Sequence, residues 1–483
     1  MCWIIGIISD HSDETANDMA VALEGLKHRG SDSVGALIYY DGMLQNSVRG
    51  RKVDPRFSDQ IRLMWPPGNI NWTTIGLGHT RYTTSKGKNL SLNSQPYTIA
   101  HDDVQMELLF NGNIPNHEKI RRDYLSGYTF STHGDTETLS RFMLHSIEEI
   151  LGNPGQKTVR TAIEETVKKV LDIFPGGYSV IAKFGSEVFA FKDIYGIRPL
   201  AFWDKKGSYI LSSEDHFFAQ RGFDYRGEVP HWSLLFPGED PRSLLQQNIM
   251  PHPDVFEFVY LAKDNSCLYW VNNSQVRFDL GFYAAQELQK CHPEWEFDTI
   301  VAVPNGANMM RTWACQALWF DSTTPNGMIR KSYSERSFMA PDQADREKIV
   351  REKFIIKKDI VRWKRILLID DSIVRWTTMR VIVDMLLETG ALSVDVISSS
   401  PIVHCGDRYG IAMSTNELVG IDHSDARKLS CEEIEMKLFY DALAWRQKAR
   451  LFYPSVENFL WVFKKHGLPN VHAAYFDGKF ING

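Results

Sequence analysis

One segment in the second half of the chain constrains the fold more than any other. It reads RILLIDDSIVRWTTMRVIVDMLLETGA and spans residues 365–391. Its run Ile366–Ile369 is fully apolar, which is typical of a buried strand in a parallel sheet. Two acids follow, then a short loop and an amphipathic helical pattern that stops at Gly390. This order predicts an α/β domain with a central parallel sheet, in which ligands bind at the carboxyl ends of the strands.

The rest of the second half continues the alternation of helices and strands. Helices are expected at Leu280–Cys291 and Met309–Trp319, and a further strand at Thr299–Val303. The segment 326–345 is polar, charged and weakly periodic, so we expect a mobile loop over the edge of the sheet.

The first half has a different pattern, dense in short strand-like runs separated by Gly, Asp and Asn. These runs are Trp3–Ile8, Val34–Tyr40, Ile75–His79, Gln105–Phe110, Tyr178–Phe184 and Val188–Lys192. Two helical patterns interrupt them, at Asp13–Leu26 and Thr136–Leu151. Many strands with a few helices predict sheets packed as layers, an α+β arrangement. A Pro-rich stretch at 237–253 is expected to link the two halves.

Composition narrows the class of protein. The chain has 483 residues, enough for two or three domains, and is 43% hydrophobic and 24% charged, as expected for a soluble globular protein. A formal charge of −6 gives no basic footprint, so we expect neither nucleic acid nor an anionic membrane as a partner. The apolar runs are too short to cross a bilayer and no signal-like segment opens the chain, so a cytoplasmic protein is expected. Its six cysteines form no C-x-x-C pair, which argues against a zinc finger or a disulfide framework.

Cys2 follows the initiator methionine directly, in MCWIIGI. If Met1 is removed, one residue carries a thiol and a free α-amine. The amine has an unperturbed pKa of about 7.7–8.0, against about 8.5 for the thiol, so it can accept the thiol proton near neutrality. An ordinary small residue in a first strand is the alternative interpretation.

Four further clusters accompany Cys2 along the first half: LKHRGSDSVG, GLGHTRYTT, LLFNGNIPN and THGDTET. Each has a structural explanation by itself, because Arg29 fits a turn, Asn111–Gly112 a tight hairpin and Asp135 a helix cap. Together they form a pocket suited to glutamine. Arg81 offers a planar fork for an α-carboxylate, and Asp135 a charge for an α-ammonium. Asn111 and the Gly112 N–H offer two donors for an oxyanion.

With these clusters the first half resembles the N-terminal-nucleophile glutaminase domain of the class II glutamine amidotransferases. The resemblance implies an αββα sandwich of the Ntn-hydrolase type over residues 2–240, with Cys2 as the nucleophile and Asn111 and Gly112 as the oxyanion donors. It implies glutamine binding by Arg81, Asp135, His79 and Arg29.

The segment 365–391 resembles the phosphoribosylpyrophosphate site of the type I phosphoribosyltransferases, which implies such a domain over residues 255–483. Joined to the first half, it resembles the glutamine phosphoribosylpyrophosphate amidotransferase family. Supporting stretches are FPGGYSV, DIYGIRPLAF, LSSED, FEFVYLAKDNS, SYSERSFMAP and SSPIVHCGDRYGIAM. The resemblance implies transfer of glutamine-derived ammonia to carbon 1 of phosphoribosylpyrophosphate, the first step of purine synthesis, by a homo-oligomer.

The acceptor site is expected after the apolar strand. By the resemblance, Asp370 and Asp371 hold the ribose hydroxyls and a Mg²⁺ ion, and the loop from Ser372 to Thr377 and Thr378 cradles the 5-phosphate. The segment with Arg330, Lys331, Tyr333 and Arg336 is expected to close over the pyrophosphate. A solvated Asp-Asp-Ser turn is the alternative.

The sequence departs from the family at several positions, all but one of them in the second half. Trp3 and Trp376 stand where the family has glycines, next to the nucleophile and in the phosphate loop. Asn305 replaces an acidic residue, and Ser332 and Glu335 replace an arginine and a glycine of the lid. His472 and Tyr475 stand where the iron–sulfur members have cluster cysteines, so no iron–sulfur cluster is expected.

These departures leave two alternatives open. One is a divergent paralogue that delivers ammonia to a different phosphorylated acceptor. The other is a non-catalytic regulatory homologue, against which the intact Cys2, Arg81, Asn111 and Asp135 argue.

Overall fold

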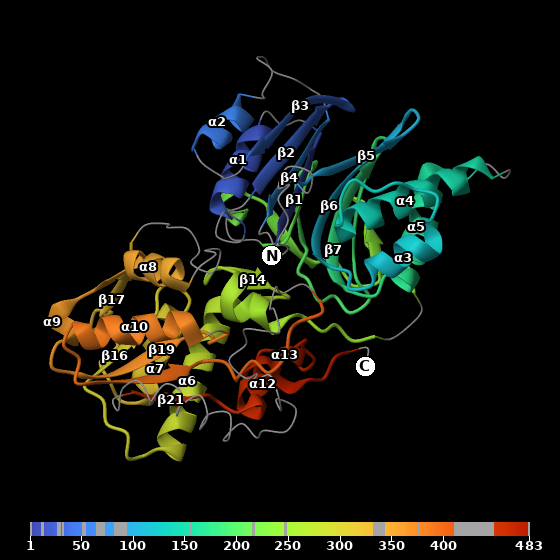
Figure 1. Ribbon diagram of the computed structural model, residues 1–483. Helices are drawn as coiled ribbons and strands as arrows, with labels where there is room; N and C mark the ends of the chain where they lie inside the picture. The colour runs from blue at the N-terminus through green and yellow to red at the C-terminus, as the bar shows by residue number, and fades with distance from the viewer. Residues whose placement is uncertain are drawn as a thin grey trace. The chain divides into compact units, whose positions relative to one another are not determined.

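The computed structural model (Figure 1) describes residues 2–10, 14–26, 30, 33–50, 55–63, 73–81, 94–153, 157–214, 218–245, 249–331, 343–374, 376–409 and 449–481. These residues form two compact units. The first contains the described residues up to Pro253 together with Cys267–Trp270, Arg408 and Tyr409. The second contains Asp254–Ser266, Val271–Asp407 and residues 449–481.

Two antiparallel sheets form the core of the first unit. One has seven strands in the order β11-β9-β10-β1-β4-β2-β3. These are β1 (Trp3–Ser9), β2 (Ser33–Tyr40), β3 (Met43–Gly50), β4 (Thr74–Arg81), β9 (Ala201–Lys205), β10 (Ser208–Ser212) and β11 (Asp224–Glu228). The other has six strands in the order β13-β12-β8-β7-β6-β5. These are β5 (Tyr97–His101), β6 (Val104–Asn113), β7 (Gly177–Phe184), β8 (Glu187–Lys192), β12 (Ser233–Leu235) and β13 (Arg242–Ser243).

Helices cover the outer faces of the two sheets (Figure 1). The helices α1 (Thr15–Gly25) and α2 (Pro55–Arg62) share a core with the outer face of the seven-stranded sheet. The helices α3 (His117–Tyr124), α4 (Asp135–Gly152) and α5 (Val159–Ile173) share a core with the six-stranded sheet. A third core lies between the sheets and includes Ile4, Leu77, Leu109 and Ile181. The first unit is therefore an αββα sandwich, as the resemblance to the glutaminase domain implies.

The sequence of β1 explains why it occupies the centre of this sandwich. All but one of its residues, in WIIGIIS, are buried. Ile5 and Ile7 pack toward α1, and Ile4 packs toward the second sheet, so both faces of the strand are apolar. On the neighbouring strand, a Cβ at Gly78 would overlap the sulfur of Met19 in α1. This glycine lets the helix pack close to the sheet.

The second unit is built on a four-stranded parallel sheet in the order β16-β19-β20-β21. Its strands are β16 (Thr299–Ala302), β19 (Arg365–Asp370), β20 (Ser393–Ser398) and β21 (Ala449–Phe452). The helices are α6 (Asn273–Cys291), α7 (Asn308–Ala317), α8 (Gln343–Lys353), α9 (Lys358–Val361), α10 (Trp376–Glu388), α12 (Val456–Lys465) and α13 (Ala474–Asp477). The predicted strand, acid, loop and helix order of 365–391 is confirmed as β19 followed by α10. Ile382 and Leu386 of α10 pack in one core with Ile366 and Leu368 of β19.

The remaining short elements complete the description. They are the strands β14 (Cys267–Leu268), β15 (Val271–Asn272), β17 (Met328–Arg330) and β18 (Phe354–Ile356), the 3₁₀-helix η1 (Ala219–Arg221) and the π-helix η2 (Glu257–Leu261). No helix among the described residues is both long and apolar enough to span a membrane.

Two expectations about the second half need correction. The segment 326–345 is not one loop, because β17 pairs with β18 in an antiparallel ladder and α8 begins at Gln343. Residues 332–342 lie outside the described residues. The helix expected from Leu280 begins earlier, at Asn273, because the side chain of Asn272 accepts hydrogen bonds from the N–H groups of Ser274 and Gln275.

Candidate active sites

The half-buried Cys2 lies immediately before β1. The ladder between β1 and β4 pairs Trp3 with Thr80 and Ile4 with His79. Continued by one residue, this register places Cys2 opposite Arg81, the last residue of β4. Side chains alternate along a strand, so Cys2 projects to the same face as Ile4, which is buried between the two sheets. The thiol therefore faces the six-stranded sheet.

The oxyanion candidates lie inside a strand of that sheet. Asn111 and Gly112 pair with Ser179 and Tyr178 of β7, so the hairpin interpretation is wrong. Asn111 is buried, with 1% of its surface exposed. Gly112 has no room for a side chain, because a Cβ would overlap the backbone of β7. The glycine thus keeps β6 and β7 close where the two candidates lie.

Ser213 connects Asn111 to the start of β1. Its hydroxyl accepts from the Ile4 N–H and from the Asn111 side-chain amide, each at 3.4 Å. Its own N–H donates to the Ile4 carbonyl at 3.2 Å. The sequence prediction missed this residue, although it lies in the quoted stretch LSSED. Ser213 fixes the orientation of the Asn111 amide relative to the strand that carries Cys2.

Arg81 and Asp135 supply the opposite charges of the site. Asp135 opens α4, and its carboxylate accepts from the Ile114 N–H at 3.1 Å and from the Thr136 N–H at 2.8 Å. Burial raises the pKa of Asp135, while these hydrogen bonds and the charges of His117 and Arg81 oppose the rise. The bond to Ile114, just after β6, shows that Asp135 does more than cap a helix. It joins the start of α4 to the strand of Asn111.

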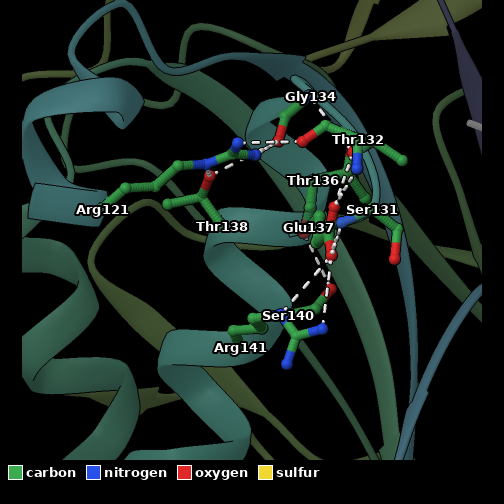
Figure 2. A network of polar contacts seen from close by, with 9 residues as sticks. All are labelled: Arg121, Ser131, Thr132, Gly134, Thr136, Glu137, Thr138, Ser140 and Arg141. Carbon is green, nitrogen blue, oxygen red and sulfur yellow. Dashed lines mark hydrogen bonds and ion pairs between the residues drawn. The ribbon is translucent and has the colours of Figure 1, made fainter. Parts of the chain in front are cut away.

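A buried polar network holds the segment before Asp135 (Figure 2). Arg121 donates to Thr138 Oγ1 at 2.7 Å, to the Thr132 carbonyl at 2.9 Å and to the Gly134 carbonyl at 2.7 Å. Its guanidinium also lies over the ring of Phe130, 4.1 Å from the centroid. One arginine side chain therefore joins two carbonyls of the turn before α4 to Thr138 within the helix.

Glu137 fixes the same turn from the other side (Figure 2). Its carboxylate accepts from the Ser131 N–H at 2.9 Å and from the N–H and hydroxyl of Thr132 at 2.7 and 2.8 Å. Arg141 pairs with it at 3.4 Å. Burial acts to raise the pKa of Glu137, but these hydrogen bonds outweigh burial and hold it below its ordinary value. The network positions Asp135 on a rigid support.

A second pair of acids lies at the carboxyl end of β19. Asp370 ends the strand, and the Asp371 N–H donates to its carboxylate at 2.9 Å. Burial and the charge of Asp371 raise the pKa of Asp370 well above its usual range. Burial also raises the pKa of Asp371 to about 6, although Arg277 and Ser372 oppose it. Two adjacent, mutually repelling carboxylates, Asp370 half-buried and Asp371 buried, are suited to a hard cation such as Mg²⁺.

The loop after β16 contacts these acids. A Cβ on Gly306 would overlap the Asp371 carboxylate, so only glycine fits there. A cavity of about 310 Å³ opens beside Pro304 and Asn305 of the same loop. Its other lining residues are Asn308, Arg311, Asn326, Met328, Ile329 and Arg330. An acidic pair next to a polar cavity at the ends of parallel strands is an arrangement for binding a small ligand.

Comparisons with known proteins cover both units of the chain. The profile of the glutamine amidotransferase domain matches residues 79–220. An amidophosphoribosyltransferase of Haemophilus influenzae is 27% identical over 502 residues, covering 100% of this chain and 93% of the relative. That of Saccharomyces cerevisiae is 26% identical with the same coverage. The solved glutamine phosphoribosylpyrophosphate amidotransferase of B. subtilis, a complex with ADP and GMP, is 27% identical with a TM-score of 0.79, covering 99% of this chain and 97% of that chain.

The chain is therefore similar to amidophosphoribosyltransferases over its whole length. A second solved structure, described as the allosteric regulatory enzyme of purine biosynthesis, is 28% identical with a TM-score of 0.80 and covers 99% of this chain and 96% of that chain. The likeness thus extends through both units.

The structure places some of the predicted site residues and leaves others outside its described part. In the first unit, Cys2 precedes β1 and Arg81 is the last residue of the neighbouring strand β4. Asp135 accepts a hydrogen bond from Ile114, just after the strand that contains Asn111 and Gly112. In the second, Ser372 donates to Asp371 at 3.0 Å, Thr378 is half-buried in the first turn of α10, and Lys331 is exposed just after β17. Arg29, Arg336 and the side chains of Trp376 and Thr377 lie outside the described residues.

The expected contact of His79 with glutamine stays a prediction. Its side chain has no exposed surface, and neither ring nitrogen has a hydrogen-bond partner among the described residues. Burial and the charge of Arg81 lower the pKa of His79 well below its usual range, so the ring is neutral. His79 lies on β4 opposite Ile4, two residues before Arg81.

Proposed function

We propose that this chain is an amidophosphoribosyltransferase that hydrolyses glutamine and transfers the ammonia to phosphoribosylpyrophosphate. The products are phosphoribosylamine, pyrophosphate and glutamate. One observation carries the proposal. A chain that aligns with amidophosphoribosyltransferases over its whole length has both Cys2 beside Arg81 and the adjacent acids Asp370 and Asp371. We assign the glutaminase to residues 2–240 and the transferase to residues 255–483.

In the first half-reaction, the Cys2 thiolate attacks the side-chain carbonyl of glutamine. The α-amine released by removal of Met1 takes the thiol proton and passes it to the leaving ammonia. Asn111 and the Gly112 N–H stabilise the oxyanion, while Arg81 and Asp135 hold the α-carboxylate and α-ammonium groups. Water then hydrolyses the glutamyl thioester, releasing glutamate and restoring the thiol.

In the second half-reaction, ammonia attacks carbon 1 of phosphoribosylpyrophosphate and pyrophosphate leaves. Asp370 and Asp371 orient the ribose hydroxyls, and the loop from Ser372 to Thr378 binds the 5-phosphate at the start of α10. A Mg²⁺ ion held by the two acids would neutralise charge on the departing pyrophosphate. Lys331 and Arg336 would close over that group and exclude water.

Measuring pyrophosphate release separates the two half-reactions. The wild-type protein should release pyrophosphate with either glutamine or ammonium chloride. Cys2→Ala should lose the glutamine-dependent reaction and keep the ammonia-dependent one, whereas Asp370→Asn should lose both. No release from wild type with either nitrogen source would refute the proposal.

Measuring glutamate production tests the alternative that ammonia goes to a different phosphorylated acceptor. Trp376 and Asn305, which depart from the family pattern in the second half, motivate this alternative. Glutamate production stimulated by another phosphorylated sugar, but not by phosphoribosylpyrophosphate, would favour that alternative. The absence of any Cys2-dependent glutamine hydrolysis would favour a non-catalytic homologue.

We further propose a cytoplasmic location and a homo-oligomeric state. The five described cysteines form no disulfide bonds, which fits a reducing compartment. Cell fractionation and analytical ultracentrifugation test these two proposals.

A further inference from the structure

A buried group of metal-ligating side chains lies in the second unit, outside both sites described above. Asp254, Asp407 and His472 each offer one ligand atom, and these atoms all lie within 4.8 Å of one another. The side chains of Asp407 and His472 have no exposed surface, and Asp254 is fully buried. The phenol of Tyr475, also fully buried, contacts the Asp254 carboxylate at 2.7 Å. We call these four residues the Asp254 cluster.

The backbone holds the cluster together from segments far apart in the sequence. Asp254, just before η2, forms an isolated parallel bridge with His472, and the Val255 N–H donates to the His472 carbonyl at 3.2 Å. The His404 N–H donates to the Tyr475 carbonyl at 2.8 Å, which ties the segment leading to Asp407 to α13. The ligand positions are therefore set by main-chain contacts, independently of how the side chains interact.

The ligand atoms of the Asp254 cluster do not suit an iron–sulfur cluster but do suit a single divalent metal ion. An iron–sulfur cluster needs thiolate ligands, whereas this cluster offers carboxylates, an imidazole and a phenol. Cys405, a cysteine close in sequence to Asp407, instead donates its thiol to the Ala474 carbonyl at 3.1 Å. Carboxylate oxygen and imidazole nitrogen together are common ligands of single Zn²⁺, Mn²⁺ or Fe²⁺ ions.

We propose that Asp254, Asp407 and His472 bind a single divalent transition-metal ion, with Tyr475 as a further oxygen donor. Ligands about 2.1 Å from one tetrahedral ion lie about 3.4 Å apart. His472 Nε2 and Asp407 Oδ1 are already 2.9 Å apart, so the remaining separations, at most 4.8 Å, close with small side-chain rotations. The ion binds three segments of the second unit to one another and has a structural role.

Metal content of the purified full-length protein tests the proposal, independently of any enzymatic activity. The protein is dialysed in buffer with excess Mg²⁺ and analysed by inductively coupled plasma mass spectrometry, before and after incubation with Zn²⁺. Wild type should hold about one equivalent of transition metal per chain, and His472→Gln and Asp407→Asn should each hold less than about a tenth of that. Removal of the ion with a chelator should lower the Tm of wild type, and Zn²⁺ should restore it.

A matched control comes from a second acid–histidine pair, in which Asp279 is buried and His466 is partly exposed. His466 Nε2 lies 2.7 Å from Asp279, which also pairs with Lys465. His466→Gln should keep the wild-type metal content. Wild-type protein that holds no transition metal and takes up no Zn²⁺ would overturn the proposal and leave a purely hydrogen-bonded cluster. Equal metal loss in His466→Gln and His472→Gln would also overturn it. Co²⁺ absorption of the wild-type protein keeps the test decisive if a cluster variant fails to fold, because imidazole and carboxylate ligation gives characteristic visible bands.

Discussion

At the scale of single residues, Ser213 joins the nucleophile strand to the oxyanion amide. Its hydroxyl accepts from both Ile4 and Asn111. Without it, the Asn111 amide loses one of the contacts that orient it before the reaction begins, and preorganised donors are what make an oxyanion site effective.

We expect Ser213→Ala to lower the glutamine-dependent kcat about fivefold, since one neutral hydrogen bond contributes about 1 kcal/mol. The KM for glutamine and the ammonia-dependent rate should stay unchanged. Steady-state kinetics with both nitrogen sources checks this. Ser212→Ala is the matched control, because Ser212 is equally buried but its hydroxyl donates to the Glu214 carbonyl. Equal losses in the two variants would contradict the positioning role.

Glu137 gives a prediction about pH. Its pKa is lowered from an ordinary value of 4.5, so the ionised carboxylate stabilises the fold above that pH. The contribution is lost as the pH falls through the lower pKa of the folded state. Glu137→Gln should reduce the free energy of unfolding of the first unit by about 2 kcal/mol at pH 7 and by much less near pH 3. Denaturant unfolding at both pH values measures this, with the exposed Glu149→Gln as control. A deficit that does not change with pH would contradict the assignment.

At the scale of elements, the loop after β16 determines where the acid pair lies. Gly306 packs directly against the Asp371 carboxylate. Gly306→Ala should displace this carboxylate and lower the ammonia-dependent rate at least about a hundredfold, with basal glutamine hydrolysis unchanged. Gly127→Ala, where an added Cβ meets open space, should have no effect. Retained ammonia-dependent activity in Gly306→Ala would show that Asp371 is not needed in its present position.

The elements themselves were largely predictable from the sequence. Apolar runs such as Trp3–Ile8 and Ile366–Ile369 mark β1 and β19, because strands buried on both faces need apolar side chains throughout. The Asn111–Gly112 pair is typical of a hairpin turn, but here it lies inside a strand. Gly112 is small because a Cβ would overlap the neighbouring strand β7. The start of α6 was predicted too late because the capping role of Asn272 was not recognised. The strand β17 was not predicted because three residues are too few to show an alternating pattern.

At the scale of the whole molecule, the sites are assembled from residues that are distant in sequence. Cys2, Arg81, Asn111 and Asp135 were identified because their residue types match a known chemistry. Strand register explains the placement of the first three, and a hydrogen bond from Ile114 that of Asp135. Ser213, Glu137 and the Asp254 cluster carry no local signal. Their roles depend on contacts such as Ile4–Ser213 and Asp254–His472, which only the folded chain creates.

The central claim is that nitrogen released at Cys2 reaches phosphoribosylpyrophosphate. The most direct test incubates the protein with glutamine labelled with ¹⁵N in the side-chain amide, phosphoribosylpyrophosphate and Mg²⁺, and analyses the sugar product by mass spectrometry. We predict that wild-type protein forms a phosphoribosylamine that carries ¹⁵N, with one glutamate per product, and that Cys2→Ala forms none. Labelled ammonia released into solution, with no labelled sugar product at any phosphoribosylpyrophosphate concentration, would contradict it.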